Sequence, residues 1–245
     1  MIRSLRAEMR KIWTVRSTYV IILIELVVVV GVAGFWVFGY KDNDKAATTP
    51  TALLDLLYGA ISAVGIFVSF IALLSVGHEY RYNTILYSLT STNRRTKLFV
   101  AKWLATLVSA LVVGAAALAL CTVGFYVGQH LHHVQTMAQT MPDWGFVWRA
   151  VVGVGGLVSF AYIIAMLLRS QVGSIAAFLV LPTTVESLLT LLLKDNTKYL
   201  PFTALGNLSN LHPSPSLKTS GVIVAGYIVG FGLLAYALFL RRDAN

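Results

Sequence analysis

The chain has 245 residues, of which 57% are hydrophobic and 12% are charged, and its formal net charge is +9. Soluble domains carry roughly a quarter charged residues, so the composition excludes an ordinary soluble protein and indicates an integral membrane protein. In such a chain the excess positive charge indicates cytoplasmic loops rather than nucleic-acid binding. The single cysteine, Cys121, excludes an intrachain disulfide.

The chain begins with a basic amphipathic segment. At 100° per residue, one arc of about 100° collects the apolar side chains Ile2, Leu5, Met9, Ile12 and Trp13. An adjacent face carries the arginines Arg3, Arg6 and Arg10. This pattern predicts an interfacial helix (residues 1–17) in the headgroup plane, with its arginines near anionic lipid and its tryptophan at the interface. A disordered basic tail is the alternative.

Six apolar segments follow, each near the ~20 residues that cross a ~30 Å hydrocarbon core. They lie at about residues 18–40, 52–76, 98–127, 146–168, 172–193 and 220–240. The first is too long for the apolar core of a signal peptide, so we expect it to be retained. No tandem repeat or linker divides the chain, and the sequence predicts one all-α transmembrane domain over residues 1–245.

The distribution of basic residues predicts the orientation. An even number of spans puts both termini on one side of the membrane. That side holds thirteen of the 19 lysines and arginines, and the opposite connections hold six. Because cytoplasmic loops are richer in lysine and arginine, we expect both termini to be cytoplasmic.

The connection between the second and third spans, residues 78–102, is then cytoplasmic; we call it the coupling loop. Its apolar residues Tyr82, Ile85, Leu86 and Leu89 follow the i, i+3, i+4, i+7 spacing of a short amphipathic helix. Asn93 offers an N-cap to the helix that follows. The pattern is typical of a docking element, and an ordinary basic loop is the alternative.

Three connections lie on the predicted external side. Residues 41–51 form a short polar loop, and residues 128–145 hold His130, His132 and His133 near Asp143. Three histidines within four residues do not converge readily on one ion, so we expect a polar loop and no metal site. Residues 194–219 mix prolines with apolar side chains, which predicts a re-entrant or interfacial pair of short helices.

Two acidic residues fall inside predicted spans, where charge is expensive. Glu25 lies in the first span and Glu186 in the fifth, at depths that differ by about 10 Å at 1.5 Å per residue, so we expect them not to pair. Either could face a polar cavity or contact a substrate; the alternative is a protonated or hydrogen-bonded packing acid. Pro182 is expected to kink or break the helix beside Glu186.

No motif of a phosphate loop, a zinc protease or a serine hydrolase occurs in the sequence. Pairs of small residues four apart, Gly124 with Gly128 and Gly226 with Gly230, favour close helix packing within or between chains.

The order of these features resembles the membrane subunits of type-2 ABC exporters. The coupling loop carries part of the resemblance through Glu79-Tyr80-Arg81, Asn83-Thr84, Asn93-Arg94-Arg95 and Ala101-Lys102. The stretch Tyr199-Leu200-Pro201-Phe202 before the last span is similar to the external re-entrant region of that family. The resemblance covers nearly the whole chain.

The resemblance implies a permease, not an enzyme, in a bacterial plasma membrane. Two identical or related membrane subunits would assemble with two copies of a soluble ATPase, which holds ATP and Mg²⁺ and drives export of an amphipathic drug, peptide or lipid-like compound. The implied ATPase-coupling residues are Glu79, Arg81, Asn83, Thr84, Ile85, Leu86, Leu89, Arg94 and Arg95. An intramembrane enzyme acting on lipid or peptide through Glu186 and the external histidines, or a non-transporting assembly subunit, are the alternatives.

Overall fold

The structure is a computed structural model, and it describes residues 2–38, 50–85, 87, 94–131, 144–210 and 214–242. These residues are helical apart from short turns, and no strand occurs among them. The predicted all-α class is therefore confirmed.

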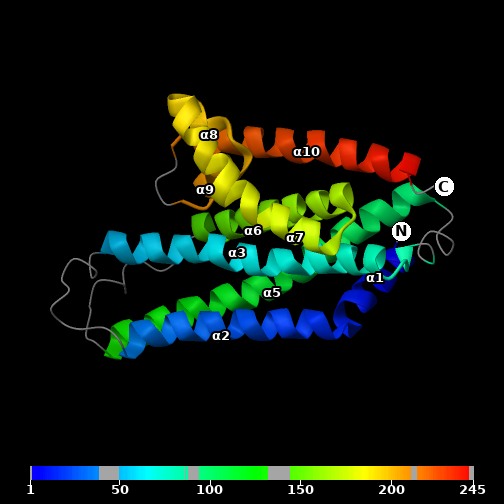
Figure 1. The fold of residues 1–245 in the computed structure, drawn as a ribbon. Coiled ribbons are helices and arrows are strands. Elements are labelled where there is room, and N and C mark those ends of the chain that lie inside the picture. Colours follow the sequence, from blue (N-terminus) through cyan, green and yellow to red (C-terminus); the bar gives the residue numbers. More distant parts are fainter. Residues whose placement is uncertain are drawn as a thin grey trace.

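Five long helices and one helix with a π-helical turn form the apolar body (Figure 1). The continuous ones are α2 (Arg16–Phe38), α3 (Pro50–Arg81), α5 (Arg95–Leu131), α6 (Trp144–Leu168) and α10 (Leu217–Arg242). The interrupted one runs through α7 (Gln171–Val180), a π-helical turn η2 (Leu181–Val185) and α8 (Glu186–Leu193). Shorter helices are α1 (Ile2–Thr14), the 3-10 helix η3 (Lys194–Tyr199) and α9 (Pro201–Leu208).

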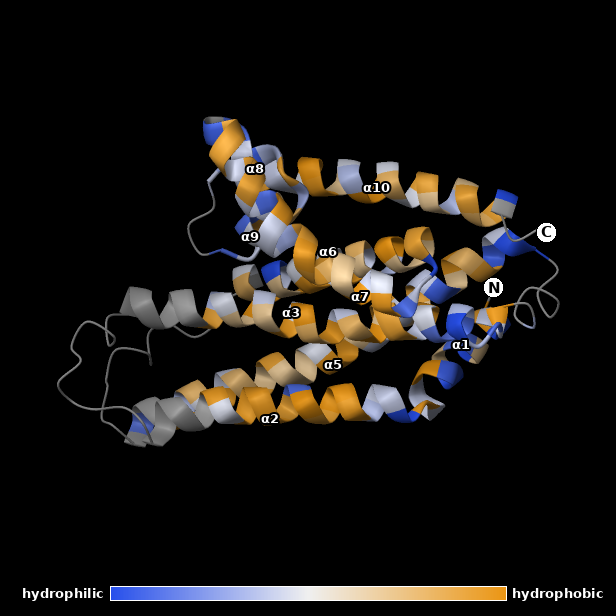
Figure 2. Cartoon of the chain, in the orientation of Figure 1, coloured by the Kyte–Doolittle hydropathy of each residue, from blue (hydrophilic) through white to orange (hydrophobic). Residues whose placement is uncertain are grey.

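The described helices identify a multi-pass membrane protein. Five stretches are long and apolar enough to cross a membrane, and a sixth is counted when the bent pair of α1 and α2 is taken as one span. Figure 2 shows the hydrophobic residues running along these helices, with hydrophilic residues gathered at the end of the bundle that carries both termini. The predicted boundaries of the spans agree with the helices to within a few residues.

The core lies where α3 packs between α6 and α5. Ile61, Val68 and Leu73 of α3 are fully buried there, and Tyr162 of α6 donates a hydrogen bond to the carbonyl oxygen of Phe99 at 2.8 Å. Helix α2 lies on one side of this core, against α5, and α10 lies on the other side, against α9 and α6 (Figure 1).

The first two helices meet at Val15 with a bend of 66°. The hydroxyl of Tyr19 donates to the carbonyl oxygen of Trp13 across this bend, at 2.5 Å. Leu5, Met9 and Trp13 pack against the core from α1, and its arginines, Arg3, Arg6 and Arg10, are exposed. The predicted amphipathic helix at the N-terminus is confirmed as a helix with one buried and one charged face.

Pro182 interrupts the α-helical pattern, as predicted, and the chain accommodates it with the π-helical turn η2 instead of a sharp break. Proline lacks a backbone N–H, and a π turn is one of the ways in which a helix absorbs the missing hydrogen bond. The α-helix resumes at Glu186, so α7, η2 and α8 together still form a single candidate span, as predicted.

Gly77 allows the close approach of α3 and α7. A Cβ atom added there would lie 3.0 Å from the Cα of Gln171, which is backbone and cannot move cheaply. We expect Gly77→Ala to lower stability by about 1–3 kcal/mol through overpacking. The matched control is Gly59→Ala, because a Cβ at Gly59 meets nothing within 4 Å. Equal thermal unfolding midpoints of the two variants in detergent would contradict this packing.

Candidate functional site

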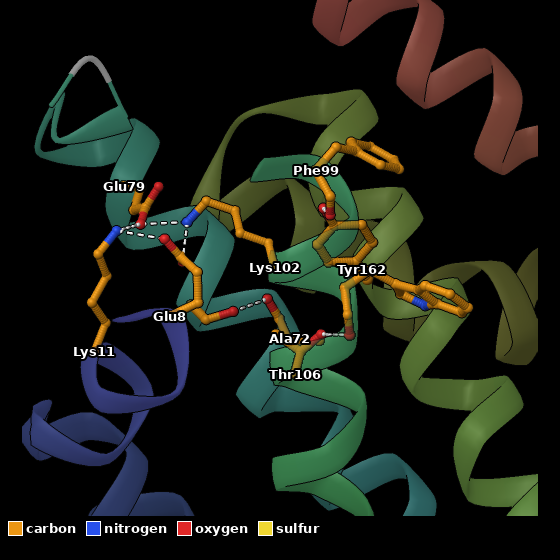
Figure 3. A network of polar contacts seen from close by, with 10 residues as sticks. Glu8, Lys11, Ala72, Glu79, Phe99, Lys102, Thr106 and Tyr162 are labelled. Atoms are coloured by element: carbon orange, nitrogen blue, oxygen red, sulfur yellow. Dashed lines mark hydrogen bonds and ion pairs between the residues drawn. The ribbon is translucent and has the colours of Figure 1, made fainter. Parts of the chain in front are cut away.

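Four charged side chains from three helices meet at the base of the coupling loop (Figure 3). Lys102 of α5 contacts Glu8 of α1 at 2.6 Å and Glu79 of α3 at 2.5 Å. Lys11 of α1 contacts the same two carboxylates, at 2.8 and 3.1 Å. We call these four residues the charge cluster.

The charge cluster is buried and electrically balanced. The side chains of Lys102, Glu8 and Glu79 are 5%, 8% and 10% exposed, whereas that of Lys11 is 45% exposed. Two carboxylates and two ammonium groups neutralise one another, which offsets the large penalty of removing charges from water. Because each lysine bridges both glutamates, loss of one partner would leave an uncompensated charge in the interior.

The protonation equilibria of α1 reflect these contacts. Burial acts to raise the pKa of Glu8, but the charge of Lys102 and hydrogen bonds from Lys102 and Lys11 outweigh it, and the pKa is lowered. Burial acts to lower the pKa of Lys11, but hydrogen bonds and attraction to Glu8 and Glu79 outweigh it, and the pKa is raised. Both shifts favour the charged forms that bind one another.

From the sequence, Glu79 is predicted as a coupling residue and Lys102 is part of the resemblance, but no ion pair between them is predicted and neither Glu8 nor Lys11 is singled out. Glu8 lies three residues after Leu5 and four before Ile12, so it is an acid on the apolar face of an amphipathic helix. Lys102 lies inside the predicted third span. Both charges fall among apolar residues. That placement was the signal in the sequence that Glu8 and Lys102 would be buried and would need partners of opposite charge.

A cavity of about 540 Å³ opens beside the charge cluster. It lies between α1, the start of α2, the end of α3 and the start of α5, and residues of the coupling loop complete its wall. Hydroxyl-bearing side chains dominate its polar lining, namely Thr14, Ser17, Thr18, Ser75, Tyr82, Thr84, Tyr87 and Thr106.

The coupling loop departs in part from the predicted amphipathic helix. Helix α3 continues to Arg81, and Asn83 then takes a positive φ of 54°, which ends the helix. Tyr82 is 63% exposed and Ile85 is 7% exposed, so the two do not share a buried face as their spacing suggested. Leu86, Leu89 and Asn93 lie outside the described residues.

Two arginines fix the C-terminal end of α10. Arg95 at the start of α5 donates to the carbonyl oxygen of Leu240 at 2.9 Å. Arg169, between α6 and α7, donates to the carbonyl oxygen of Leu238 at 3.0 Å, and its guanidinium lies over the ring of Tyr80. Cations at the last carbonyls of a helix offset its negative dipole end. Arg95, which was predicted to contact the ATPase, therefore contacts α10 of its own chain.

The other predicted coupling residues lie near this end. Arg81 donates to Oε1 of Gln171 at 3.2 Å and its guanidinium lies over the ring of Tyr82. Arg94 is exposed. Thr84 lines the cavity.

The two acids of the spans have different surroundings, and the structure does not bring them together. Glu186 accepts hydrogen bonds from the backbone N–H groups of Phe202 and Thr203, at 2.7 and 2.8 Å, and from the Thr203 hydroxyl at 2.8 Å. It thereby caps the start of α9, which matches the alternative of a hydrogen-bonded packing acid. Glu25 is buried in α2, and neither of its oxygens has a hydrogen-bond partner among the described residues.

Most of the predicted polar loop with histidines, residues 128–145, lies outside the residues that the structure describes. His130 is exposed near the end of α5, and His132, His133 and Asp143 lie outside the described residues. Among the residues that the structure describes, no group of three or more metal-ligating side chains gathers.

Breaking the charge cluster should destabilise the protein strongly. Lys102→Met leaves Glu8 and Glu79 without their most buried counter-charge, and we expect a loss of about 3–5 kcal/mol. Lys97→Met is the matched control, because Lys97 is exposed on the same helix and its loss should change stability by about 0.5 kcal/mol or less. Thermal unfolding in detergent measures both; similar midpoints would contradict the role of Lys102.

The charge cluster should also set the pH range of stability. Since the pKa of Glu8 is lowered by folding, its contribution is present above the unfolded value of about 4.3 and is lost as pH falls through the folded pKa. Since the pKa of Lys11 is raised, its contribution is present below about 10.4 and is lost at higher pH. We expect Glu8→Gln to flatten the decline of the unfolding midpoint on acidification; an unchanged slope would count against this assignment.

Comparison with known proteins places the chain in a family. Among curated proteins, none matches the sequence. A family model described as "Protein of unknown function (DUF2705)" matches residues 18–244, which is all of the chain apart from the first 17 residues and the last one. The chain therefore belongs to the DUF2705 family.

Proposed function

We propose that this protein is the permease subunit of an ABC export complex, powered by a separate ATPase. The observation that carries the proposal is the charge cluster, which joins α1, α3 and α5 at the base of the coupling loop. An element that receives force from a partner must be attached firmly to the helices that move. The charge cluster provides that attachment through buried ion pairs.

The two helices that flank the coupling loop suit such transmission. Helix α3 has 32 residues and α5 has 37, so each is about 50 Å long at 1.5 Å per residue. Both run from the loop through the core of the bundle, where they pack on each other and on α6. A displacement of the loop would therefore be carried along two stiff rods toward the opposite end.

The coupling loop also presents side chains to a partner. Tyr82 is 63% exposed and Tyr87 is 77% exposed, and Arg94, the residue before α5, is also exposed. Tyrosine and arginine are enriched where proteins bind one another. The chain has no phosphate loop, so ATP and Mg²⁺ would be held by two copies of the partner ATPase.

The apolar surface supports a second membrane subunit. The stretches Gln171–Leu193 and Leu217–Arg241 are far less buried than the other span candidates. They expose large side chains such as Leu191, Leu192 and Leu233. Lipid and a second, identical or related permease chain would cover these faces.

The orientation and the substrate complete the proposal. The concentration of basic residues supports cytoplasmic termini, with α1 lying in the headgroup region. The membrane would be the plasma membrane of a bacterium, as the resemblance to exporter permeases implies. The transported compound would be amphipathic. An intramembrane enzyme is less well supported, because Glu186 is occupied by three hydrogen bonds to α9.

The docking role predicts which substitutions release the ATPase. We expect the double variant Tyr82→Ala, Tyr87→Ala to insert normally but to co-purify with at least about tenfold less of a soluble ATPase. The matched control is Tyr126→Ala, since Tyr126 is 54% exposed near the other end of α5. Affinity purification from native membranes, followed by mass spectrometry and an ATP hydrolysis assay, measures the effect. Absence of any phosphate-loop protein from the wild-type preparation would refute the proposal.

A further inference from the structure

Glu25 lies on the buried face of α2. Its side chain is 1% exposed, and the same face carries Thr18 seven residues before it and Val29 four residues after it, both buried. This face packs against α5 and α3. The opposite face of α2 exposes Leu23, Ile24 and Val27.

Nothing in the described surroundings compensates a charge on Glu25. Neither carboxyl oxygen has a hydrogen-bond partner among the described residues, in contrast to Glu186 with its three donors. The sequence holds no lysine or arginine between residues 17 and 40 of this segment or between residues 103 and 129 of α5. Burial of a carboxylate without partners is costly, so this packing favours the protonated form of Glu25 over the ionised form.

The titratable groups that face Glu25 do not supply a counter-charge. On α5 the thiol of Cys121 interacts electrostatically with it. The part of α3 from Leu57 to Val76 has Tyr58 as its only titratable side chain, which packs against Phe146 and Arg149. On α1, Glu8 and Lys11 belong to the charge cluster.

We propose that Glu25 is a membrane-embedded proton-binding site whose proton is released when α2 and α5 separate. Ionised Glu25 needs water or a cation around it, and in the packed arrangement the residue is only 1% exposed. Separation of the two helices would hydrate the carboxyl and let its proton leave, and protonation would allow them to pack again. This site is independent of the export function, because the proton acts on helix packing within one chain.

The proton on Glu25 makes the packing of α2 against α5 depend on pH. The packed state binds one more proton at Glu25 than the separated state, so raising the pH favours separation and lowers stability. Glu25→Gln removes the titration, and Glu25→Met removes it without leaving an amide that needs partners. Both variants should lack this pH dependence.

Two measurements on the full chain in lipid nanodiscs test the proposal. Infrared spectroscopy at neutral pH should show the C=O stretch of a protonated carboxyl that disappears in Glu25→Gln and Glu25→Met but persists in Glu186→Gln. Thermal unfolding between pH 6 and about 9 should show a midpoint that falls with pH more steeply in the wild type than in either Glu25 variant.

Each outcome is decisive. Absence of the Glu25 band at neutral pH would show an ionised carboxyl and overturn the proposal. The Glu25 band could be present while the unfolding midpoint falls equally with pH in the wild type and in both Glu25 variants. That result would overturn the link between the proton and helix separation. Neither result depends on an ATPase partner, so failure here leaves the proposed export function untouched.

Discussion

The charge cluster is the interaction on which the rest of the structure depends. A bundle of apolar helices in lipid has little to fix how one helix is placed against another, because lipid tails are as apolar as the side chains. Buried ion pairs differ, since they are satisfied only in one arrangement. Lys102 holds Glu8 and Glu79 at once, and thereby sets α1 against the ends of α3 and α5.

Polar contacts are concentrated at the ends of the bundle. At the end with both termini, Arg95 and Arg169 secure α10 alongside the charge cluster. Toward the opposite end, Glu186 secures α9. Between them the described interior is largely apolar, and Glu25 is an acid there without a partner. The polar contacts therefore fix the position of the helices relative to one another mainly at the two ends of the bundle.

Much of the fold was predictable from the sequence, and the site was predictable only in part. The six apolar runs and the amphipathic start determine the helices, because membrane crossing demands about 20 apolar residues and one charged face marks an interfacial helix. The charge cluster was missed because pairing of Glu8 with Lys102 depends on how helices distant in sequence meet. The helical spacing of Tyr82 and Ile85 was misleading, since the left-handed turn at Asn83 separates them. The role of Glu186 as a cap required the position of α9, which no local pattern gives.

The most direct test of the central claim is photo-crosslinking in native membranes. A photoreactive amino acid placed at Tyr87, beside the charge cluster, should form an adduct with a soluble protein that contains a phosphate loop. The same group placed at Tyr126, near the other end of α5, should form no such adduct. Adducts of equal yield at both positions, or none at Tyr87, would contradict a coupling loop that seats an ATPase.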